Sequence, residues 1–295
     1  MGKYLDPKAD LTFKLIFEHE ELLISLLNAL LPLDEGKQIE HVEYLPAELV
    51  PENPGKKDSV VDVRCTDQQG RQFIVEMQMY WNQYFKNRVL LNASKAIVKQ
   101  LKDGEGYNLI QPVYCLNLTN DIGFDSEPGE FYHDYAIVNV AHSDRIIEGL
   151  RFVFVELPKF KPGNIAQKKM AVLWLRFLTE INKKTEEAPA ELLENEETRK
   201  ALSLVERSAM SDEQLYAYDK FWMSITDQEG FLEARYNKGM AEGMAKGRAE
   251  GIAEGIAEGE INERMRNARS LKENGVPIDV IVKSLGLTQE EVTKL

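Results

Sequence analysis

The sequence is poor in the residues on which several classes of protein depend. Only two of its 295 residues are cysteines, Cys65 and Cys115, and both stand in apolar stretches. This pattern predicts two core thiols and neither a disulfide framework nor a zinc site. No apolar run approaches the ~20 residues of a membrane helix. The charged residues from Lys3 to Lys14 do not resemble a signal peptide, so we expect a cytoplasmic protein without a membrane span.

Positive charge is also scarce. The 36 Lys and Arg residues are outnumbered by 49 Asp and Glu residues, which gives a net charge of −13. Much of the acidic excess lies in residues 186–197 and in the late repeat described below. This balance argues against a protein coated by nucleic acid, but basic residues around one cleft suffice for an enzyme that acts on DNA. The 43% of hydrophobic residues is enough for a globular core.

The chain is organised around residues 59–81, which we interpret as two β-strands joined by a turn at residues 67–70. Side chains alternate between the two faces of a strand. Asp62 therefore lies on one face of the first strand, and Glu76 and Gln78 share one face of the second. In the simplest hairpin register, Asp62 lies near both. The opposite faces are predicted to carry the apolar residues Val61, Val63, Cys65, Phe73, Val75, Met77 and Met79.

Two carboxylates in an otherwise apolar sheet are costly to bury unless their charge is compensated. Mg²⁺ compensates such charge well, because it takes a few carboxylate oxygens and keeps several waters. A cation at Asp62 and Glu76 would activate water and neutralise charge on a phosphate. The alternative is that both acids point to solvent from a sheet with only one buried face.

The hairpin and the N-terminus together resemble a known family. An acid, a short hairpin and then Glu76-Met77-Gln78 resemble the PD-(D/E)XK nucleases, which usually have Lys where this chain has Gln78. Residues 10–17, DLTFKLIF, resemble the D-x-x-F-K-x-x-F opening of the Rpn family, the recombination-promoting nucleases also called PD-(D/E)XK nuclease family transposases. The resemblance covers nearly the whole chain and is strongest over residues 6–118.

This resemblance implies an α/β fold, with a restriction-endonuclease-like αβββαβ core, a mixed sheet and a helical C-terminal region. It implies a bacterial, cytoplasmic, metal-dependent endonuclease acting on double-stranded DNA, linked to recombination or to conflict with mobile elements and phages. Asp62 and Glu76 would hold Mg²⁺, with Mn²⁺ or Ca²⁺ as substitutes. Gln78 would orient the attacking water or contact the scissile phosphate. The alternatives are a catalytically degenerate nuclease fold that binds DNA or assembles, and a nuclease acting on RNA.

Helical periodicity predicts one amphipathic helix over residues 10–31. Asp10 is either the N-cap of this helix or, by the resemblance, a further acid of the site. Residues 39–50 read as a strand in which Glu48 is another candidate acid. The predicted elements that follow the hairpin are a helix over residues 82–101 and strands over 111–118, 132–140 and 150–157.

Several basic residues are candidates for DNA contacts. Arg88, Lys95 and Lys99 fall near one face of the predicted helix 82–101. Such a stripe suits the phosphates of DNA, or it is an ordinary solvated face. Lys57 matches a basic residue that the family often places just before the metal-site strand, and its alternative is a solvated loop lysine.

The C-terminal part of the sequence is predicted to be helical from residue 166. Glycine recurs every fourth residue from Gly239 to Gly259, which is an internal repeat. We interpret it as a helix for homo-oligomerisation or a semi-flexible stalk, with a disordered linker as the alternative. The predicted division is a nuclease-like domain over residues 1–165, a helical extension over 166–235, the repeat over 236–262 and a short helical tail over 263–295.

Overall fold

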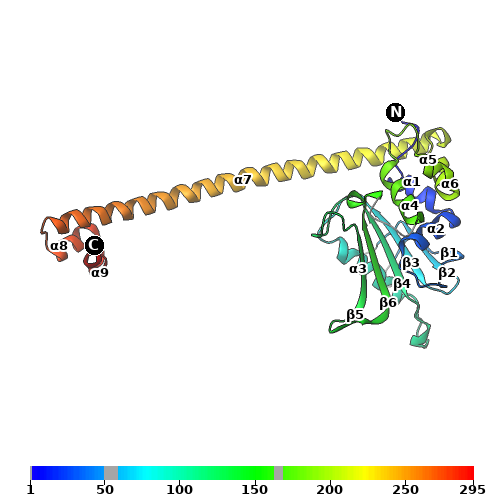
Figure 1. Ribbon diagram of the computed structural model, residues 1–295, viewed down its shortest axis with the longest axis horizontal. Coiled ribbons are helices and arrows are strands. Elements are labelled where there is room, and N and C mark those ends of the chain that lie inside the picture. The colour runs from blue at the N-terminus through cyan, green and yellow to red at the C-terminus, as the bar shows by residue number, and fades with distance from the viewer. Residues whose placement is uncertain (1, 50–58, 163–168) are drawn as a thin grey trace. The chain divides into compact units, whose positions relative to one another are not determined.

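The computed structural model describes residues 2–49, 59–162 and 169–295, and the chain divides into two compact units, Met1–Met223 and Ser224–Leu295. Within the described residues of the first unit, six strands form one sheet (Figure 1). The strands are β1 (Val42–Tyr44), β2 (Val63–Asp67), β3 (Gln72–Gln78), β4 (Val113–Thr119), β5 (Tyr132–Asn139) and β6 (His142–Glu156). The helices are α1 (Asp10–Phe17), α2 (Glu20–Leu30), α3 (Phe85–Val98), α4 (Lys169–Glu180), α5 (Ala190–Glu194), α6 (Glu196–Leu204), α7 (Asp212–Glu273), α8 (Ile278–Leu285) and α9 (Gln289–Lys294).

The sheet is mixed and its order is β1-β2-β3-β4-β6-β5. Strands β1, β2 and β3 pair antiparallel, β4 is parallel to both β3 and β6, and β5 is antiparallel to β6. The change to parallel pairing after β3 requires a crossover, and α3 supplies it. The predicted α/β class and the αβββαβ order of the core are therefore confirmed.

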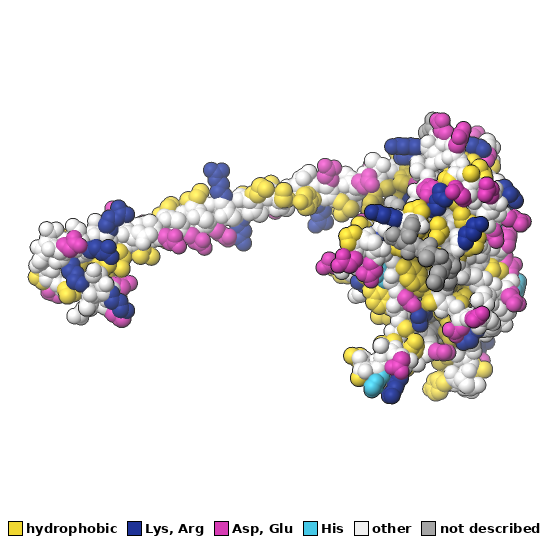
Figure 2. All heavy atoms as spheres, in the orientation of Figure 1, with side chains coloured by type: hydrophobic (Ala, Val, Ile, Leu, Met, Phe, Trp, Pro, Cys, Tyr) yellow, Lys and Arg dark blue, Asp and Glu magenta, His cyan; other side chains and the backbone are white. Residues whose placement is uncertain are grey.

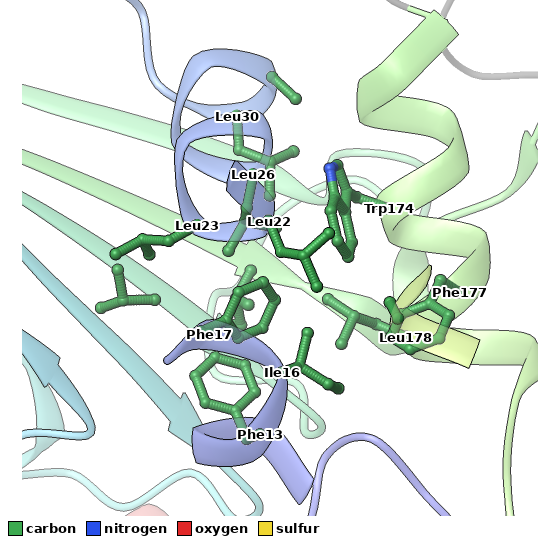
Figure 3. Packing of buried hydrophobic residues seen from close by; sticks show 14 of the residues in the cluster. Phe13, Ile16, Phe17, Leu22, Leu23, Leu26, Leu30, Trp174, Phe177 and Leu178 are labelled. Carbon is green, nitrogen blue, oxygen red and sulfur yellow. The ribbon is translucent and has the colours of Figure 1, made fainter. Parts of the chain in front are cut away.

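The helices bury the two faces of the sheet in two separate cores. One face packs against α1, α2, α4 and α6, with the rings of Phe13, Phe17 and Trp174 at the centre (Figures 1 and 3). The Trp174 indole nitrogen donates to Ser25 Oγ at 3.0 Å, which satisfies the one polar atom of this buried ring. The other face packs against α3 through residues such as Ile74 and Val89. Both faces are covered, so an acid between sheet and helix is shielded from water.

The structure corrects three details of the prediction. Residues 10–31 form two helices, because His19 is extended and the turn lets α1 and α2 bury their apolar faces in the same core. The strand predicted over 39–50 is reduced to β1, since Pro46 cannot donate to a sheet and only an isolated bridge joins Glu48 to Val60. Val61 packs on the α3 side, although strict alternation would place it on the other face.

The glycine repeat is part of a helix. Helix α7 contains all six repeating glycines, and apart from neighbouring residues and the nearby backbone of α7, no described atom lies within 4 Å of the position that a Cβ would take at any of them. Acidic, basic and hydrophobic side chains are interspersed along α7 (Figure 2), including the ion pairs Lys238–Glu242 and Lys246–Glu250. The repeat is therefore helical in the structure, and its roles as a stalk or in oligomerisation stay predictions.

The tail of the second unit folds on itself. The end of α7 packs with α8 and α9 around Ala268, Ile281 and Val292. Thr288 and Glu291 form the reciprocal hydrogen bonds of a capping box at the start of α9. None of the described helices has both the length and the apolar composition needed to cross a bilayer.

One capping interaction gives a direct stability prediction. Asn195 caps α6, and its side-chain oxygen accepts from the Thr198 backbone N–H at 3.0 Å. Replacing Asn195 by alanine leaves this donor without its partner, so we expect the free energy of unfolding to fall by about 1 kcal/mol. Urea denaturation of the full chain measures this change, and an unchanged midpoint would contradict the capping role.

Candidate functional site

The hairpin brings the two predicted metal-binding acids together. Val63 pairs with Val75 in the antiparallel β2–β3 ladder. Asp62 lies just before this ladder and Glu76 just after Val75, and the two carboxylates are close enough for the charge of Asp62 to raise the pKa of Glu76. Asp62 accepts a hydrogen bond from the Met77 backbone N–H at 2.7 Å through Oδ2, and this bond fixes its carboxylate beside β3. The register predicted from the sequence is confirmed.

Glu76 lies between the sheet and α3, where two side chains of that helix contact it. Its Oε1 accepts from Asn92 Nδ2 at 2.8 Å, and its Oε2 lies 3.2 Å from Arg88 Nη2. The same guanidinium nitrogen donates to the side-chain oxygen of Gln78. Gln78 in turn donates to the backbone oxygen of Tyr80 at 2.8 Å. Arg88 therefore links the buried acid to the amide that replaces the usual lysine.

The electrostatics of the acid pair show that its negative charge is only partly compensated. Burial, helped by the charge of Asp62, raises the pKa of Glu76 to about 7 against the lowering effects of Arg88 and Asn92. Burial is also the main cause of the raised pKa of Asp62, opposed by the hydrogen bond from Met77. Two carboxylates that each resist ionisation form a site at which a cation would be stabilised.

The donor set fits a hard divalent cation. Within the described ranges, no three His, Cys, Asp or Glu side chains are grouped so as to hold a metal ion. A cation bound by Asp62 and Glu76 alone would complete its coordination with water, which is how Mg²⁺ is usually bound. Each carboxylate oxygen has two lone pairs, so the single bonds from Met77, Asn92 and Arg88 leave acceptor capacity for a metal.

Asp62 is accessible from a small cavity. The cavity has a volume of about 160 Å³ and lies between the end of α1, β1 and the start of β2, with Lys14, Glu18 and Tyr44 among its lining residues. A larger cavity of about 520 Å³ lies near the start of β4 beside Arg71 and Arg151, and none of the predicted site residues lines it. Of the two acids, Asp62 lines the smaller cavity, and Glu76 lines neither.

Asp10 lies near this pair but not in the role of a cap. Ala9 is the N-cap of α1, so the N-cap interpretation of Asp10 is wrong, and Asp10 is the first residue of the helix. Its carboxylate is exposed and forms an ion pair with Lys14 at 2.7 Å. Asp10 nevertheless acts on the site through its charge, which contributes to raising the pKa of Asp62. Glu48 is exposed and belongs to an isolated bridge.

The predicted basic stripe of α3 serves different purposes along its length. Arg88 contacts the buried acid, as described above. Lys95 donates to Ser59 Oγ at 2.9 Å and to the Leu49 backbone oxygen at 3.2 Å, so it holds the segment that leads into β2. Lys99 is exposed at the end of the helix. Lys57 lies outside the described residues.

Sequence reasoning missed Asn92, the buried amide that binds Glu76. Its position was available in the pattern, because Asn92 follows Arg88 by four residues and such residues share one helix face. Asn92 is a polar residue on the same side of this amphipathic helix as the apolar residues Val89 and Ala93. A polar side chain on a buried face indicates a buried hydrogen-bond partner.

Comparison with known families agrees with this geometry. The model of the PD-(D/E)XK nuclease family transposases matches residues 7–235, which include the acid pair, Gln78 and α3. The chain belongs to this family. Searches of the curated proteins and of the solved structures returned no match. Membership in the PD-(D/E)XK nuclease family transposases supports a nuclease-type function, and nucleases of this kind generally use divalent metals.

As a PD-(D/E)XK nuclease family transposase, the chain departs from the pattern in its family name at two positions. Val61 precedes Asp62 where that pattern has proline. Gln78 stands where that pattern has lysine, and an amide carries no positive charge. In this protein the guanidinium of Arg88 contacts the Gln78 side chain. A positive charge is therefore present at this point of the site, delivered from α3 instead of from β3.

Proposed function

We propose that the chain is a Mg²⁺-dependent endonuclease that hydrolyses phosphodiester bonds of double-stranded DNA. The observation that carries this proposal is the acid pair, because Asp62 and Glu76 stand next to the paired residues Val63 and Val75, their charges interact, and burial raises the pKa of both. When bound, the cation supplies Lewis-acid activation of water and neutralises charge on the phosphate. Mn²⁺ and Ca²⁺ are expected to occupy the same site.

Each protein group has a defined part in this proposal. The Met77 N–H and the Asn92 amide hold the two carboxylates in position for the metal. Gln78 orients the attacking water or contacts the scissile phosphate, and Arg88 places positive charge beside it. Asp10 contributes a long-range negative charge that favours cation binding.

The DNA is proposed to approach over the exposed cations next to the site. Arg88 remains 43% exposed in its side chain although it contacts Glu76, and Lys99 is exposed farther along α3. Both are suited to phosphate contacts, as is Lys57 by the family resemblance. Lys95 supports this surface indirectly, because its ammonium group is bonded to the segment before β2.

The biological setting is proposed on the family alone. We infer cytoplasmic DNA cleavage linked to recombination, mobile elements or phage conflict, in a homo-oligomer assembled through the repeating glycines of α7. The open space at these glycines supports close approach of another helix.

One contact favours a second candidate, a catalytically degenerate nuclease fold that binds DNA or assembles. The guanidinium of Arg88 lies 3.2 Å from Glu76 and partly neutralises this acid without a metal. If this ion pair persists when divalent cations are supplied, the acid pair is structural. In the metal-dependent nuclease a bound cation displaces Arg88 from Glu76. In the degenerate fold the ion pair between Arg88 and Glu76 remains.

A plasmid-nicking assay tests the proposed activity. Purified full-length protein is incubated with supercoiled plasmid in Mg²⁺, in Mn²⁺, in Ca²⁺ and in EDTA. We expect nicked or linear product with Mg²⁺ or Mn²⁺ and none in EDTA, because water activation needs the cation. If protein equimolar with plasmid gives no product in millimolar Mn²⁺, the catalytically degenerate nuclease fold is the better account. Equal cleavage in EDTA would exclude a metal-dependent mechanism.

A further inference from the structure

A second buried acid lies at the carboxyl ends of the parallel strands. Glu156, the last residue of β6, is fully buried. Its Oε1 accepts from the backbone N–H groups of Gly123 at 2.7 Å and Phe124 at 3.0 Å. Its Oε2 lies 2.9 Å from His133 Nε2 and 2.8 Å from Lys159 Nζ. Burial alone would raise the pKa of Glu156, but these hydrogen bonds outweigh it and hold the pKa below its usual value.

The loop that Glu156 binds is joined to the end of β3. The Asn120 N–H donates to the backbone oxygen of Gln78 at 2.8 Å. The Asp121 carboxylate accepts from the Trp81 N–H at 2.9 Å. The indole of Trp81 also lies directly against Gly123, where an added Cβ would be 1.8 Å from a ring atom. The loop therefore contacts the chain at the candidate site residue Gln78, at the end of β3, and again three residues later at Trp81.

The same ring connects the loop to the start of α3. Trp81 packs against Phe124 with ring centroids 5.0 Å apart and against Phe85 with centroids 5.3 Å apart. Phe85 is the first residue of α3 and lies one turn before Arg88. The loop bound by Glu156 is thus connected to Gln78 through a backbone hydrogen bond and to the start of α3, which carries Arg88, through tilted and edge-to-face aromatic contacts.

We propose that Glu156 is a positioning residue that fixes Gln78 and Arg88 in the site through the loop at residues 120–124 and through Trp81. This inference rests on the proposed nuclease function. Each acid also has a contact outside this chain of residues, because Asp62 is bound by Met77 and Glu76 is bound by Asn92 as well as by Arg88. Loss of the loop contacts should therefore impair cleavage while metal binding persists.

The test separates metal affinity from turnover in the full-length protein. We compare wild type with Glu156→Ala, Glu156→Gln and Gly123→Ala, and use Gly230→Ala as the matched control because open space surrounds Gly230. We expect Mn²⁺ affinity to stay within about twofold and the single-turnover cleavage rate at saturating DNA to fall by about 10- to 100-fold in Glu156→Ala. Glu156→Gln keeps an acceptor oxygen for the loop and should retain more activity than Glu156→Ala.

Amide hydrogen exchange gives a readout that does not need nuclease activity. In Glu156→Ala and Gly123→Ala, exchange at Asn120 and Trp81 should be faster than in wild type, and exchange in α7 should be unchanged. Unchanged exchange at both amides, or parallel loss of Mn²⁺ affinity and cleavage, would overturn the proposal. If wild type itself cleaves no DNA, the proposed function fails, and exchange alone decides whether Glu156 positions the end of β3. If Glu156→Ala does not fold, Gly123→Ala supplies the same comparison.

Discussion

Replacement of Asp62 by asparagine is expected to lower the rate of DNA cleavage by about 1,000-fold or more, equivalent to about 4 kcal/mol of transition-state stabilisation. The amide keeps the size of the side chain and can still accept from the Met77 N–H, so the hairpin register should persist. It removes one of the two negative charges that bind the cation. The effect should therefore appear in metal affinity and in cleavage, and not in the fold.

Mn²⁺ calorimetry, single-turnover cleavage and thermal unfolding of the same preparation measure these quantities. Asp103→Asn is the matched control. Asp103 is exposed beyond the end of α3, so this substitution removes the same charge outside the site. We expect wild-type cleavage from the control. If Asp62→Asn cleaves as fast as Asp103→Asn, Asp62 has no part in the reaction.

Replacement of Glu76 by glutamine is expected to remove the loss of stability that ionisation of Glu76 causes as the pH rises. The pKa of Glu76 is raised to about 7 in the folded protein from an ordinary value of 4.5. The folded state therefore favours the protonated form, so the contribution of Glu76 to stability is fully present below pH 4.5 and is lost as the pH rises through 7. The loss amounts to about 3 kcal/mol by pH 8. Glutamine does not titrate, so Glu76→Gln should gain about this much relative to wild type between pH 4.5 and pH 8.

Urea denaturation in EDTA, at pH values from 4.5 to 8, measures this difference. Glu43→Gln, at an exposed position of β1, is the control and should follow wild type at every pH. Saturating Mn²⁺ should remove most of the pH-dependent loss in wild type, because metal binding favours the ionised carboxylate. A constant difference between Glu76→Gln and wild type across this range would show that Glu76 ionises as an ordinary surface acid does.

The part of the site that lies within the hairpin could be predicted from the sequence. Alternation along two short strands and a short turn determine which side chains oppose each other, so Asp62 and Glu76 could be paired without coordinates. Gln78 followed from the same periodicity. Contacts between elements could not be predicted in this way. Helical spacing placed Arg88 on a basic stripe, but only the packing angle of α3 shows that its guanidinium reaches Glu76 and Gln78.

The fold shows the same division between local and tertiary information. The order of helices and strands followed from periodicity and from the family resemblance, and it is confirmed. The break between α1 and α2 was missed, because residues 10–31 keep one helical period while His19 turns the chain so that both helices reach Trp174. The apolar content of residues 169–180 predicted α4, but its burial against α1 depends on contacts between residues distant in sequence.

The position of a bound cation tests the central claim most directly. Crystals of the full-length protein soaked in millimolar Mn²⁺ would give an anomalous density peak wherever the ion binds. We predict one peak within about 2.2 Å of a carboxylate oxygen of Asp62 and of Glu76, with the guanidinium of Arg88 displaced from Glu76 but still in contact with Gln78. A fully occupied Arg88–Glu76 ion pair with no peak between the two acids would contradict the metal-dependent mechanism and leave the degenerate nuclease fold as the better account.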